Sequence, residues 1–323
     1  MLVNYEEGLR YIADIICSCE SVILLTHRRP DGDTIGSACA LAAAVRKLGK
    51  KSKVLYSDKV PERFAFLADG LGDDEITGKT AVVAVDIASR ELLAVESEFY
   101  GGKIDACIDH HKTNDGWADL TCVKTYSACG ECILDLIDTL GVKEDDYIAK
   151  ALYTAISTDT GCFKYGNTNA HTHLAAARLY ETAQGLEELN NAYFMLRTAK
   201  EKEVEFAVHK KQKLFSDGKG CISSITIEDM NRLGVVMEEL ESVTDAVRTT
   251  KGVLIGAFLK EVHKNVFRVS LRGNTNGVDV SHICGIFGGG GHRGAGGCTV
   301  EGTESEAREK IEEAIANYLS CIG

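Results

Sequence analysis

The chain has 323 residues, enough for about two domains of ordinary size, and its 45% hydrophobic and 26% charged residues are typical of a folded globular protein. The formal charge of −12 argues against a protein that coats long nucleic acid, because that needs a basic surface, although a short anionic ligand at one focused site stays allowed. No run approaches the roughly 18 apolar residues of a membrane span, and the acidic N-terminal stretch MLVNYEEGLR lacks a signal-peptide core. We therefore predict a cytoplasmic protein that binds neither long duplexes nor membranes.

Short apolar runs alternate with helical patterns through the first half of the chain. The runs predicted as strands are SVILLTH, KSKVLYS, TAVVAVD, KIDACID and TCVKTY. A helix rich in small residues is expected to end at Lys47, and further helices are expected over residues 130–140, 145–157 and 171–184. This alternation is typical of an α/β domain built on a parallel sheet.

The second half of the chain has a different pattern. Residues 189–214 are charged, follow a helical period and contain neither proline nor glycine, which predicts a helical linker. Beyond it, GCISSITI, VLIGAFLKE and NVFRVSLRG are predicted strands, followed by a glycine cluster and a helix over residues 304–318. The predicted organisation is a first domain over residues 1–188, the linker, and a smaller α+β domain over residues 215–323.

The twelve cysteines do not form a recognisable disulfide or zinc framework. Most are dispersed in apolar runs, which is typical of small buried side chains. The one CxxC pair, Cys129 and Cys132, has no second pair at zinc spacing, so we expect both residues on one helical turn.

Side chains that can bind metal follow the apolar runs of the first half. His27, Asp31 and Asp33 come after the first run, and Asp86 ends TAVVAVD. The other candidates, at the end of KIDACID and in ALYTAISTDTG, are Asp109, His110, His111 and Asp159. Because parallel strands end at one edge of a sheet, these side chains are expected to lie close together.

Aspartates at the ends of apolar runs are costly to bury without a positive partner, and a metal ion would provide one. Mixed carboxylate and imidazole ligands favour Mn²⁺, or Mg²⁺, Fe²⁺ or Co²⁺, over an all-oxygen calcium site. An EF-hand loop does not fit, because Ile35 and Ala42 stand where it needs oxygen ligands. Simple helix capping remains an alternative for Asp31 or Asp33 alone, but it does not explain the whole set.

The ordered motifs THRRPDGD, VVAVD, CIDHH and STDTG resemble the four motifs of the DHH phosphoesterase superfamily. The stretch FGGGGHRGAGG is similar to the signature of the associated DHHA1 domain. The two-domain form most resembles the NrnA-like branch, whose members are nanoRNases that also hydrolyse 3'-phosphoadenosine 5'-phosphate (pAp). This resemblance implies an α/β fold in which a parallel-sheet DHH domain, holding the metal, is joined by the helical linker to a smaller DHHA1 substrate-binding domain, with the active site in the interdomain cleft.

The resemblance also implies two divalent metal ions, most often Mn²⁺, with Asp86 bridging them. The other ligands of one ion would be His27 and Asp31. The other ligands of the second ion would be Asp33, His110 and Asp159. Of the catalytic residues, His111 would face the scissile phosphate beside Asp86, and Asp109 would support the metal ligands.

Residues in the second half are implied to bind substrate. Arg272 in VSLRGN resembles the family's Ser-Leu-Arg-Ser strand, with Gly273 in place of the second serine, and would pair with a terminal phosphate. Gly288, Gly289, Gly290 and Gly291 would let a phosphate approach bare backbone N–H groups, and His292 would add a donor. A glycine-rich turn that only eases packing is the alternative.

Two further sequence features have competing interpretations. The glycine spacing also fits a dinucleotide-binding fingerprint, but no βαβ unit frames it. Arg90 could lean over the metal site from four residues after Asp86, although a solvated arginine explains it equally well.

The predicted function is a metal-dependent phosphoesterase that releases mononucleotides from very short oligonucleotides and converts pAp to AMP and phosphate. One alternative is a phosphodiesterase for linear or cyclic dinucleotides. An inorganic pyrophosphatase fits less well. The second domain of such enzymes carries a different signature, rich in lysine and arginine, which we do not find in this sequence. A non-catalytic nucleotide-binding module would be expected to lack some ligands, yet all are present. A homodimer is compatible with each of these functions.

Overall fold

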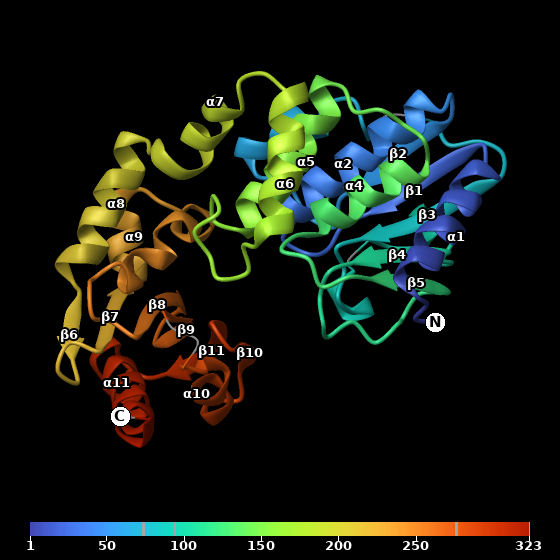
Figure 1. The fold of residues 1–323 in the computed structure, drawn as a ribbon. Coiled ribbons are helices and arrows are strands. Elements are labelled where there is room, and N and C mark those ends of the chain that lie inside the picture. The colour runs from blue at the N-terminus through green and yellow to red at the C-terminus, as the bar shows by residue number, and fades with distance from the viewer. Residues whose placement is uncertain (73–74, 94, 275–276, 323) are drawn as a thin grey trace. The chain divides into compact units, whose positions relative to one another are not determined.

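The computed structural model describes residues 1–72, 75–93, 95–274 and 277–322. The chain divides into two compact units, Met1–Leu196 and Arg197–Gly323, drawn in Figure 1. Each unit has hydrophobic clusters of its own. The division falls inside the predicted linker, whereas the limits of the two predicted domains stay a prediction.

The first unit contains the predicted parallel sheet. Its strands are β1 (Ser21–Leu25), β2 (Lys51–Leu55), β3 (Thr80–Val85), β4 (Ala106–Asp109) and β5 (Leu120–Val123). They lie in the order β2-β1-β3-β4-β5, and every neighbouring pair is parallel. The prediction of an α/β domain with a parallel sheet is therefore confirmed.

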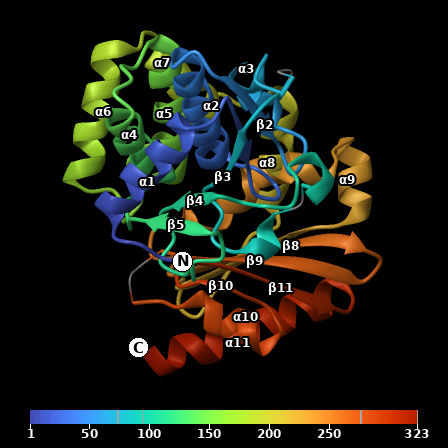
Figure 2. The ribbon, with the colours of Figure 1, turned by 90° about the vertical axis from the view of Figure 1, so that its right-hand side faces the viewer.

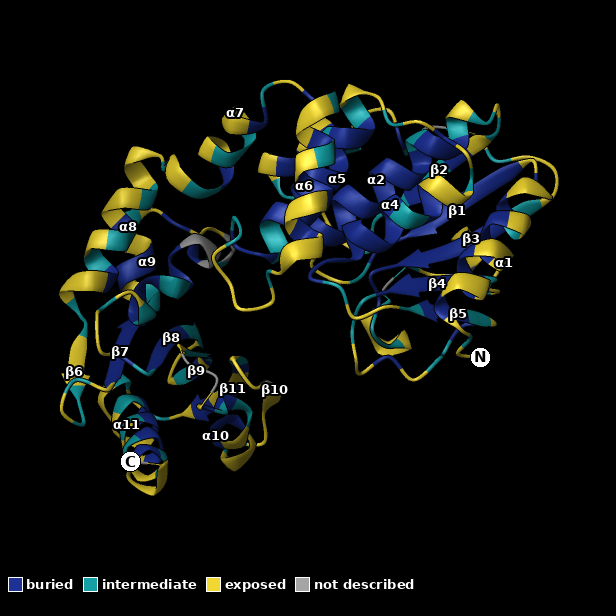
Figure 3. Ribbon diagram, viewed as in Figure 1, coloured by how far each residue is buried: buried dark blue, intermediate teal, exposed yellow. Residues whose placement is uncertain are grey.

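Helices cover one face of this sheet (Figure 1). They are α1 (Tyr5–Cys17), α2 (Gly32–Lys47), α4 (Cys129–Thr139), α5 (Asp146–Asp159) and α6 (Ala170–Thr182), with the short α3 (Ala65–Ala68) and α7 (Leu186–Asn190). In Figure 3, α2 is almost wholly buried, whereas α6 exposes its outer side. The predicted helices differ from the observed ones by one or two residues at most ends.

The helices over the sheet pack closely because they carry small residues. A Cβ at Gly36 of α2 would lie 2.3 Å from the Ala151 carbonyl oxygen of α5. A Cβ at Gly130 of α4 would lie 2.6 Å from Ala155 Cβ, also of α5. These distances are too short for any side chain larger than hydrogen, so glycine sets the spacing of α2, α4 and α5.

The predicted CxxC helical turn is also observed. Cys129 and Cys132 lie in the first turn of α4, and both thiols are buried and free. Burial raises the pKa of both thiols well above the ordinary range, so they are inert hydrophobic side chains rather than a redox pair.

The second unit is a smaller α+β domain, as predicted. Its strands are β6 (Lys213–Phe215), β7 (Gly220–Ile225), β8 (Ile255–His263), β9 (Val266–Gly273), β10 (Gly290–His292) and β11 (Ala295–Glu301). They form a mixed sheet in the order β10-β11-β9-β8-β7-β6, in which only β7 and β8 are parallel among the described strands. Its helices are α8 (Ala199–Lys210), α9 (Ile227–Leu233), α10 (Val280–Ile286) and α11 (Glu304–Ile322).

The helices of the second unit cover both faces of its sheet. Figure 2 shows α10 and α11 along one face, where they enclose a cluster that includes Ile222 and Ala257. On the other face, α8 contributes Val204 to a separate cluster with Cys221 and Phe258. Adjacent residues of β7 and β8 thus point into different cores, as a pleated strand requires.

The segment over residues 189–214, predicted as a helical linker, is largely helical but is not one continuous helix. A π-helical turn at Asn191–Met195 ends before α8 begins, and β6 forms at the far end of the segment. Thr198 and Glu201 form a capping box, in which each side chain accepts the other's backbone N–H, and this pairing starts a new helix. The β10–β11 hairpin was not predicted either, because its glycines leave no alternating apolar pattern.

Candidate metal centre

The predicted metal-binding side chains converge where the strands of the first sheet end. His27 follows β1 by two residues, Asp86 follows β3 directly, and Asp109 is the last residue of β4. Asp31 caps the N-terminus of α2, and Asp159 is the last residue of α5. Because β1, β3 and β4 are parallel neighbours, their ends place these groups side by side.

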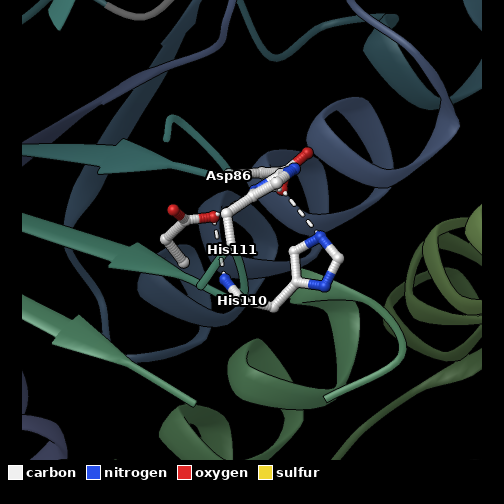
Figure 4. Close-up of side chains that lie close together, drawn as sticks. Asp86, His110 and His111 are labelled. Atoms are coloured by element: carbon white, nitrogen blue, oxygen red, sulfur yellow. Dashed lines mark hydrogen bonds and ion pairs between the residues drawn. The ribbon is translucent and has the colours of Figure 1, made fainter. Parts of the chain in front are cut away.

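Two histidines approach Asp86 from different directions. His27 Nε2 lies 3.5 Å from Asp86 Oδ2 and 3.6 Å from Asp31 Oδ1. His110 Nε2 lies 3.5 Å from Asp86 Oδ1, and Figure 4 shows the Asp86 carboxylate beside the His110 ring. Asp86 therefore presents one oxygen to each histidine, as a bridging ligand would.

Three clusters of possible ligand atoms occur among the described residues, and one of them consists of Asp86, Asp109, His110 and His111. We call His27 and Asp31 the His27 group; its atoms and a carboxylate oxygen of Asp86 all lie within 4.8 Å of one another. Asp33, His110 and Asp159 form the His110 group within the same limit. The structure thus brings together all six residues that the sequence indicated as metal ligands.

The conformation of Asp86 supports a cation beside it. Its side chain is only 3% exposed, and Oδ1 has no hydrogen-bond partner among the described residues. Its backbone has a φ of 61°, in the left-handed region that non-glycine residues seldom adopt. A buried, unsatisfied carboxylate oxygen is costly unless a positive ion meets it, so the residues present fit a divalent metal.

The outer ring nitrogens of both histidines are fixed by backbone carbonyl groups. His27 Nδ1 lies 2.7 Å from the Arg28 oxygen, and His110 Nδ1 lies 3.1 Å from the Tyr126 oxygen. A carbonyl oxygen only accepts, so each Nδ1 carries the proton. When the ring is neutral, its Nε2 lone pair is then available to a metal, as in many histidine metal sites.

Asp33 is held by the start of α4. Its carboxylate accepts the backbone N–H of Cys129 at 2.6 Å and that of Gly130 at 3.0 Å. The Ser37 hydroxyl donates to the same carboxylate at 3.0 Å. These donors orient Asp33 without neutralising its charge, which leaves it able to bind a cation.

The concentration of carboxylates perturbs their protonation. Burial and the nearby charges of Asp86 and Asp159 raise the pKa of Asp33 well above its ordinary value. Burial, with the charge of Asp86, raises the pKa of Asp159 to about 7, although His110 opposes this. Burial alone would lower the pKa of His27, but its contacts with Asp31 and Asp86 raise it to about 11. Without a cation, protons therefore reduce the negative charge of the centre.

We expect Mn²⁺ binding to release protons and to strengthen as the pH rises. A histidine with a pKa of about 11 holds its proton at pH 7, and an Asp159 with a pKa of about 7 is partly protonated there. A metal ligand must lose that proton, so about one proton or more should leave per site filled. Titration calorimetry at pH 7 in two buffers with different ionisation enthalpies measures this number. Identical apparent enthalpies in both buffers would contradict the prediction.

His111 differs from the other two histidines of the centre. Its Nδ1 lies 2.8 Å from Asp109 Oδ1 and 3.6 Å from Asp86 Oδ1, and its ring is 31% exposed. Burial works against the charged imidazole, but the hydrogen bond to Asp109 and the charges of Asp86 and Asp109 together outweigh it and raise the pKa of His111. His111 is thus suited to hold a proton at the exposed side of the centre.

Asp109 is supported by side chains that sequence reasoning missed. Asn114 donates to Asp109 Oδ2 at 2.7 Å and to the Ile87 carbonyl oxygen at 3.2 Å. Trp117 also donates to the Ile87 oxygen, at 2.9 Å. These bonds secure the buried Asp109 and the turn after Asp86. Both donors lie in a polar loop, where no pattern distinguishes them from solvated residues.

The predicted substrate-binding residues of the second unit lie on β9, on β10 and just before β10, and β11 separates the two strands. Arg272 of β9 pairs across the sheet with Ala295 of β11, and β11 forms a hairpin with β10. Arg272 Nε lies 3.3 Å from Asp245 Oδ1, and the side chain is 27% exposed. A phosphate ligand would therefore compete with Asp245 for this guanidinium group.

The glycines of the hairpin have different roles in the fold. A Cβ at Gly289 would lie 2.2 Å from the Gly297 carbonyl oxygen, and one at Gly291 would lie 2.5 Å from that of Ala295. Packing alone therefore requires glycine at these two positions. A Cβ at Gly290 would meet no atom within 4 Å, and the φ of this residue is ordinary, so the fold does not explain the glycine. Gly288 is likewise open but has a φ of 68°.

The roles of the other two predicted contacts, Arg90 and His292, stay predictions. Arg90 is exposed at the start of the 3₁₀ turn Arg90–Leu92. His292 ends β10, but its side chain lies outside the described part of the structure. The glycine cluster belongs to an antiparallel hairpin, which agrees with the rejection of a dinucleotide-binding βαβ unit.

The fold and the metal centre define the class of protein. The model of the DHH family, N-terminal domain, matches residues 21–156, and the model of the DHHA1 domain matches residues 217–321. The chain belongs to the DHH family of metal-dependent phosphoesterases and is a hydrolase.

Similar proteins narrow this class. The chain is 30% identical to the bifunctional oligoribonuclease and PAP phosphatase NrnA of Thermus thermophilus, in an alignment that covers 99% of this chain and 97% of that protein. It is 26% identical to the NrnA of Bacillus subtilis over 87% of this chain and 90% of that protein. The crystal structure of an exopolyphosphatase-related protein from Bacteroides fragilis has the same fold, with a TM-score of 0.85 and 20% identity over 98% of both chains.

The helices can also be compared with the requirements of a membrane-spanning segment. None of those within the described ranges has the length and hydrophobicity that a bilayer-spanning segment needs.

Proposed function

We propose that the protein hydrolyses very short oligonucleotides to mononucleotides and converts pAp to AMP and phosphate, using two divalent metal ions, of which Mn²⁺ fits best. The observation that carries the proposal is the position of Asp86 between His27 and His110. Its Oδ2 lies 3.5 Å from His27 Nε2, and its Oδ1 lies 3.5 Å from His110 Nε2. The names of the Thermus and Bacillus relatives support these substrates. The mixed imidazole and carboxylate ligands favour Mn²⁺ over Ca²⁺.

The proposed chemistry divides between the metal and the protein side chains. A pair of divalent ions supplies an activated water molecule and neutralises charge on the phosphate. Asp86 would hold the pair together, and the two ligand groups would fix its position. His111, oriented by Asp109, would donate a proton or hydrogen bond to the departing oxygen.

The second unit would bind the substrate rather than the metal. Arg272 would pair with a terminal phosphate of the substrate, and the open backbone at Gly290 would accept a close approach of that phosphate. On an acidic protein, a longer strand gains no further contacts with phosphates, so binding should not increase with length. We therefore expect longer oligonucleotides to be no better substrates than dinucleotides.

Product analysis tests the proposed function. Labelled dinucleotides, trinucleotides, longer oligonucleotides and pAp are incubated with Mn²⁺, with Ca²⁺ or with a chelator, and the products are separated. We expect mononucleotides and AMP with Mn²⁺, little product with Ca²⁺ and none with chelator. Full activity in chelator would contradict the metal centre. A strong preference for linear or cyclic dinucleotides over pAp would favour the dinucleotide phosphodiesterase instead.

The homodimer stays a prediction. Sedimentation at several protein concentrations would measure the oligomeric state.

Replacing Arg272 with alanine should weaken the binding of dinucleotides and pAp. Loss of a charge-assisted hydrogen bond costs about 1.5–3 kcal/mol, or roughly 10–150-fold in KM. The matched control is Arg268→Ala, which removes an exposed arginine from the same strand. A generic ester such as bis-p-nitrophenyl phosphate should not distinguish the Arg272 variant from the wild type. Equal losses on both substrates, or none on either, would rule out the anchoring role.

A further inference from the structure

The turn that leads into α4 touches two residues of the His110 group. This lead-in turn comprises residues 126–130. The Tyr126 carbonyl accepts the proton on His110 Nδ1 at 3.1 Å. The backbone N–H groups of Cys129 and Gly130 donate to both carboxylate oxygens of Asp33. The orientations of His110 and Asp33 therefore depend on the backbone of one short segment.

The same turn also reaches the third member of that group. Asn167 donates to the Ser127 carbonyl at 3.0 Å and to the backbone oxygen of Asp159 at 3.1 Å. The His27 group makes its hydrogen bonds elsewhere: His27 to the Arg28 carbonyl, and Asp31 to N–H groups of its own helix, α2. Within the described residues, the lead-in turn thus supports one ligand group and not the other.

A buried carboxylate fixes the lead-in turn. Glu131 of α4 has no exposed surface, and it accepts the Ser127 backbone N–H at 3.0 Å. It also accepts the Thr172 hydroxyl at 3.3 Å, and His171 Nδ1 lies 2.6 Å from its other oxygen. A buried carboxylate is costly unless such donors surround it, so these bonds tie the turn to the start of α6.

His171 reaches the turn a second way. Its ring stacks on Tyr126, with centroids 4.2 Å apart and planes 13° from parallel, and Tyr126 is the residue whose carbonyl orients His110. The side chain of His171 is nevertheless 44% exposed. Two residues further along α6, His173 instead stacks on Phe163, at 5.4 Å. An exposed histidine used only for packing would not need both the carboxylate and the ring.

We infer that Glu131 and His171 are positioning residues for one of the two metal ions, the one bound by the His110 group. They act through the lead-in turn, which sets the orientation of Asp33, His110 and Asp159. The ion bound by the His27 group does not depend on them. This inference rests on the proposed pair of ions and adds that their affinities are controlled separately.

Titration with Mn²⁺ alone tests the inference without any substrate. Wild-type protein should bind two ions. His171→Ala should weaken one of them by about 10-fold or more, the usual scale for a residue that orients a ligand, and leave the other within about twofold. The matched control, His173→Ala, should leave both affinities within about twofold of wild type. Glu131→Gln should act in the same direction as His171→Ala and more strongly, by up to about 100-fold.

Folding is checked by thermal melting of each metal-free variant. Glu131 is wholly buried, so if its variant loses stability, the comparison of the variants at the exposed His171 and His173 decides the outcome.

Electron paramagnetic resonance gives a second measure of Mn²⁺ binding, because a close pair of Mn²⁺ ions has a coupled spectrum and a single ion does not. His171→Ala at intermediate Mn²⁺ should show the single-ion spectrum where wild type shows the coupled one.

A double-mutant cycle identifies which ion is weakened. In an Asp159→Asn background the affected site is already impaired, so adding His171→Ala should change Mn²⁺ binding little. In an Asp31→Asn background, His171→Ala should keep its full effect. Equal effects in both backgrounds, or none in either, would overturn the inference while leaving the two-ion proposal intact. Wild-type protein that binds fewer than two ions would overturn both.

Discussion

Replacing Asp86 with asparagine should abolish turnover and Mn²⁺ binding while leaving the fold intact. Asp86 is proposed to bridge the ions bound by the two groups, so its loss should cost several kcal/mol of transition-state stabilisation, about 1,000-fold or more in kcat. Asparagine has the same shape and also tolerates the left-handed backbone, with its φ of 61°, so strain is not added. Steady-state kinetics and bound Mn²⁺ per chain measure the two losses.

The stability of the metal-free Asp86→Asn variant provides a second measurement. Burial raises the pKa of Asp86, so its ionisation costs stability in the metal-free protein as the pH rises through that pKa. Asparagine removes this cost, and the variant should melt at the same or a higher temperature than metal-free wild type at neutral pH. The control is Asp115→Asn, an exposed position in the nearby loop. Activity above about a tenth of wild type would contradict the bridging role.

Replacing His111 with alanine should lower kcat by about 100- to 10,000-fold while the protein keeps its metal, since the proposed role of His111 is proton donation. Its neighbour provides the contrast: His110→Ala should lose Mn²⁺ as well as activity, because His110 Nε2 lies among three carboxylates. Metal analysis and single-turnover kinetics on a dinucleotide separate the two effects. Depleted metal in His111→Ala would show that this residue is a ligand.

A pH profile adds a check on His111. In the metal-free protein, the hydrogen bond to Asp109 and the charges of Asp86 and Asp109 raise the pKa of the imidazole against the effect of burial. In a nuclear magnetic resonance titration of metal-free protein, His111 should therefore lose its proton at a higher pH than an ordinary histidine. Bound Mn²⁺ would oppose this shift, because its positive charge disfavours the protonated imidazole.

The ends of the parallel strands could be predicted because apolar runs and polar ends are both visible in the sequence. Asp86 and Asp109 follow such runs directly, and the sheet order then brings them together. The groups that orient the ligands could not be predicted in the same way. Many are backbone atoms, such as the Tyr126 carbonyl and the Cys129 N–H, and every residue possesses these. Their role depends on tertiary structure alone.

The limits of prediction in the second unit have other causes. The helical period over residues 189–214 continues through Thr198, but the capping box with Glu201 starts a new helix there, and this short signal was outweighed by the longer pattern. In the glycine hairpin, β10 and β11 pair although few side chains are available to show alternation. The hairpin is specified by close backbone contacts, for which glycine is required but not diagnostic.

The close contact between α2 and α5 links the packing of the core to the spacing of the carboxylates. Gly32 lies between Asp31 and Asp33, and a Cβ there would lie 2.4 Å from the hydroxyl oxygen of Thr158, the neighbour of Asp159. A larger residue at this position would act as a wedge between the helices and would separate Asp159 from Asp33. In many enzymes, substitutions that raise stability lower activity, because the active site is strained. At this contact the same van der Waals surface supports both the stability of the core and the spacing of the carboxylates. Substitutions that loosen it should therefore lower stability and activity together, so selection for one property preserves the other.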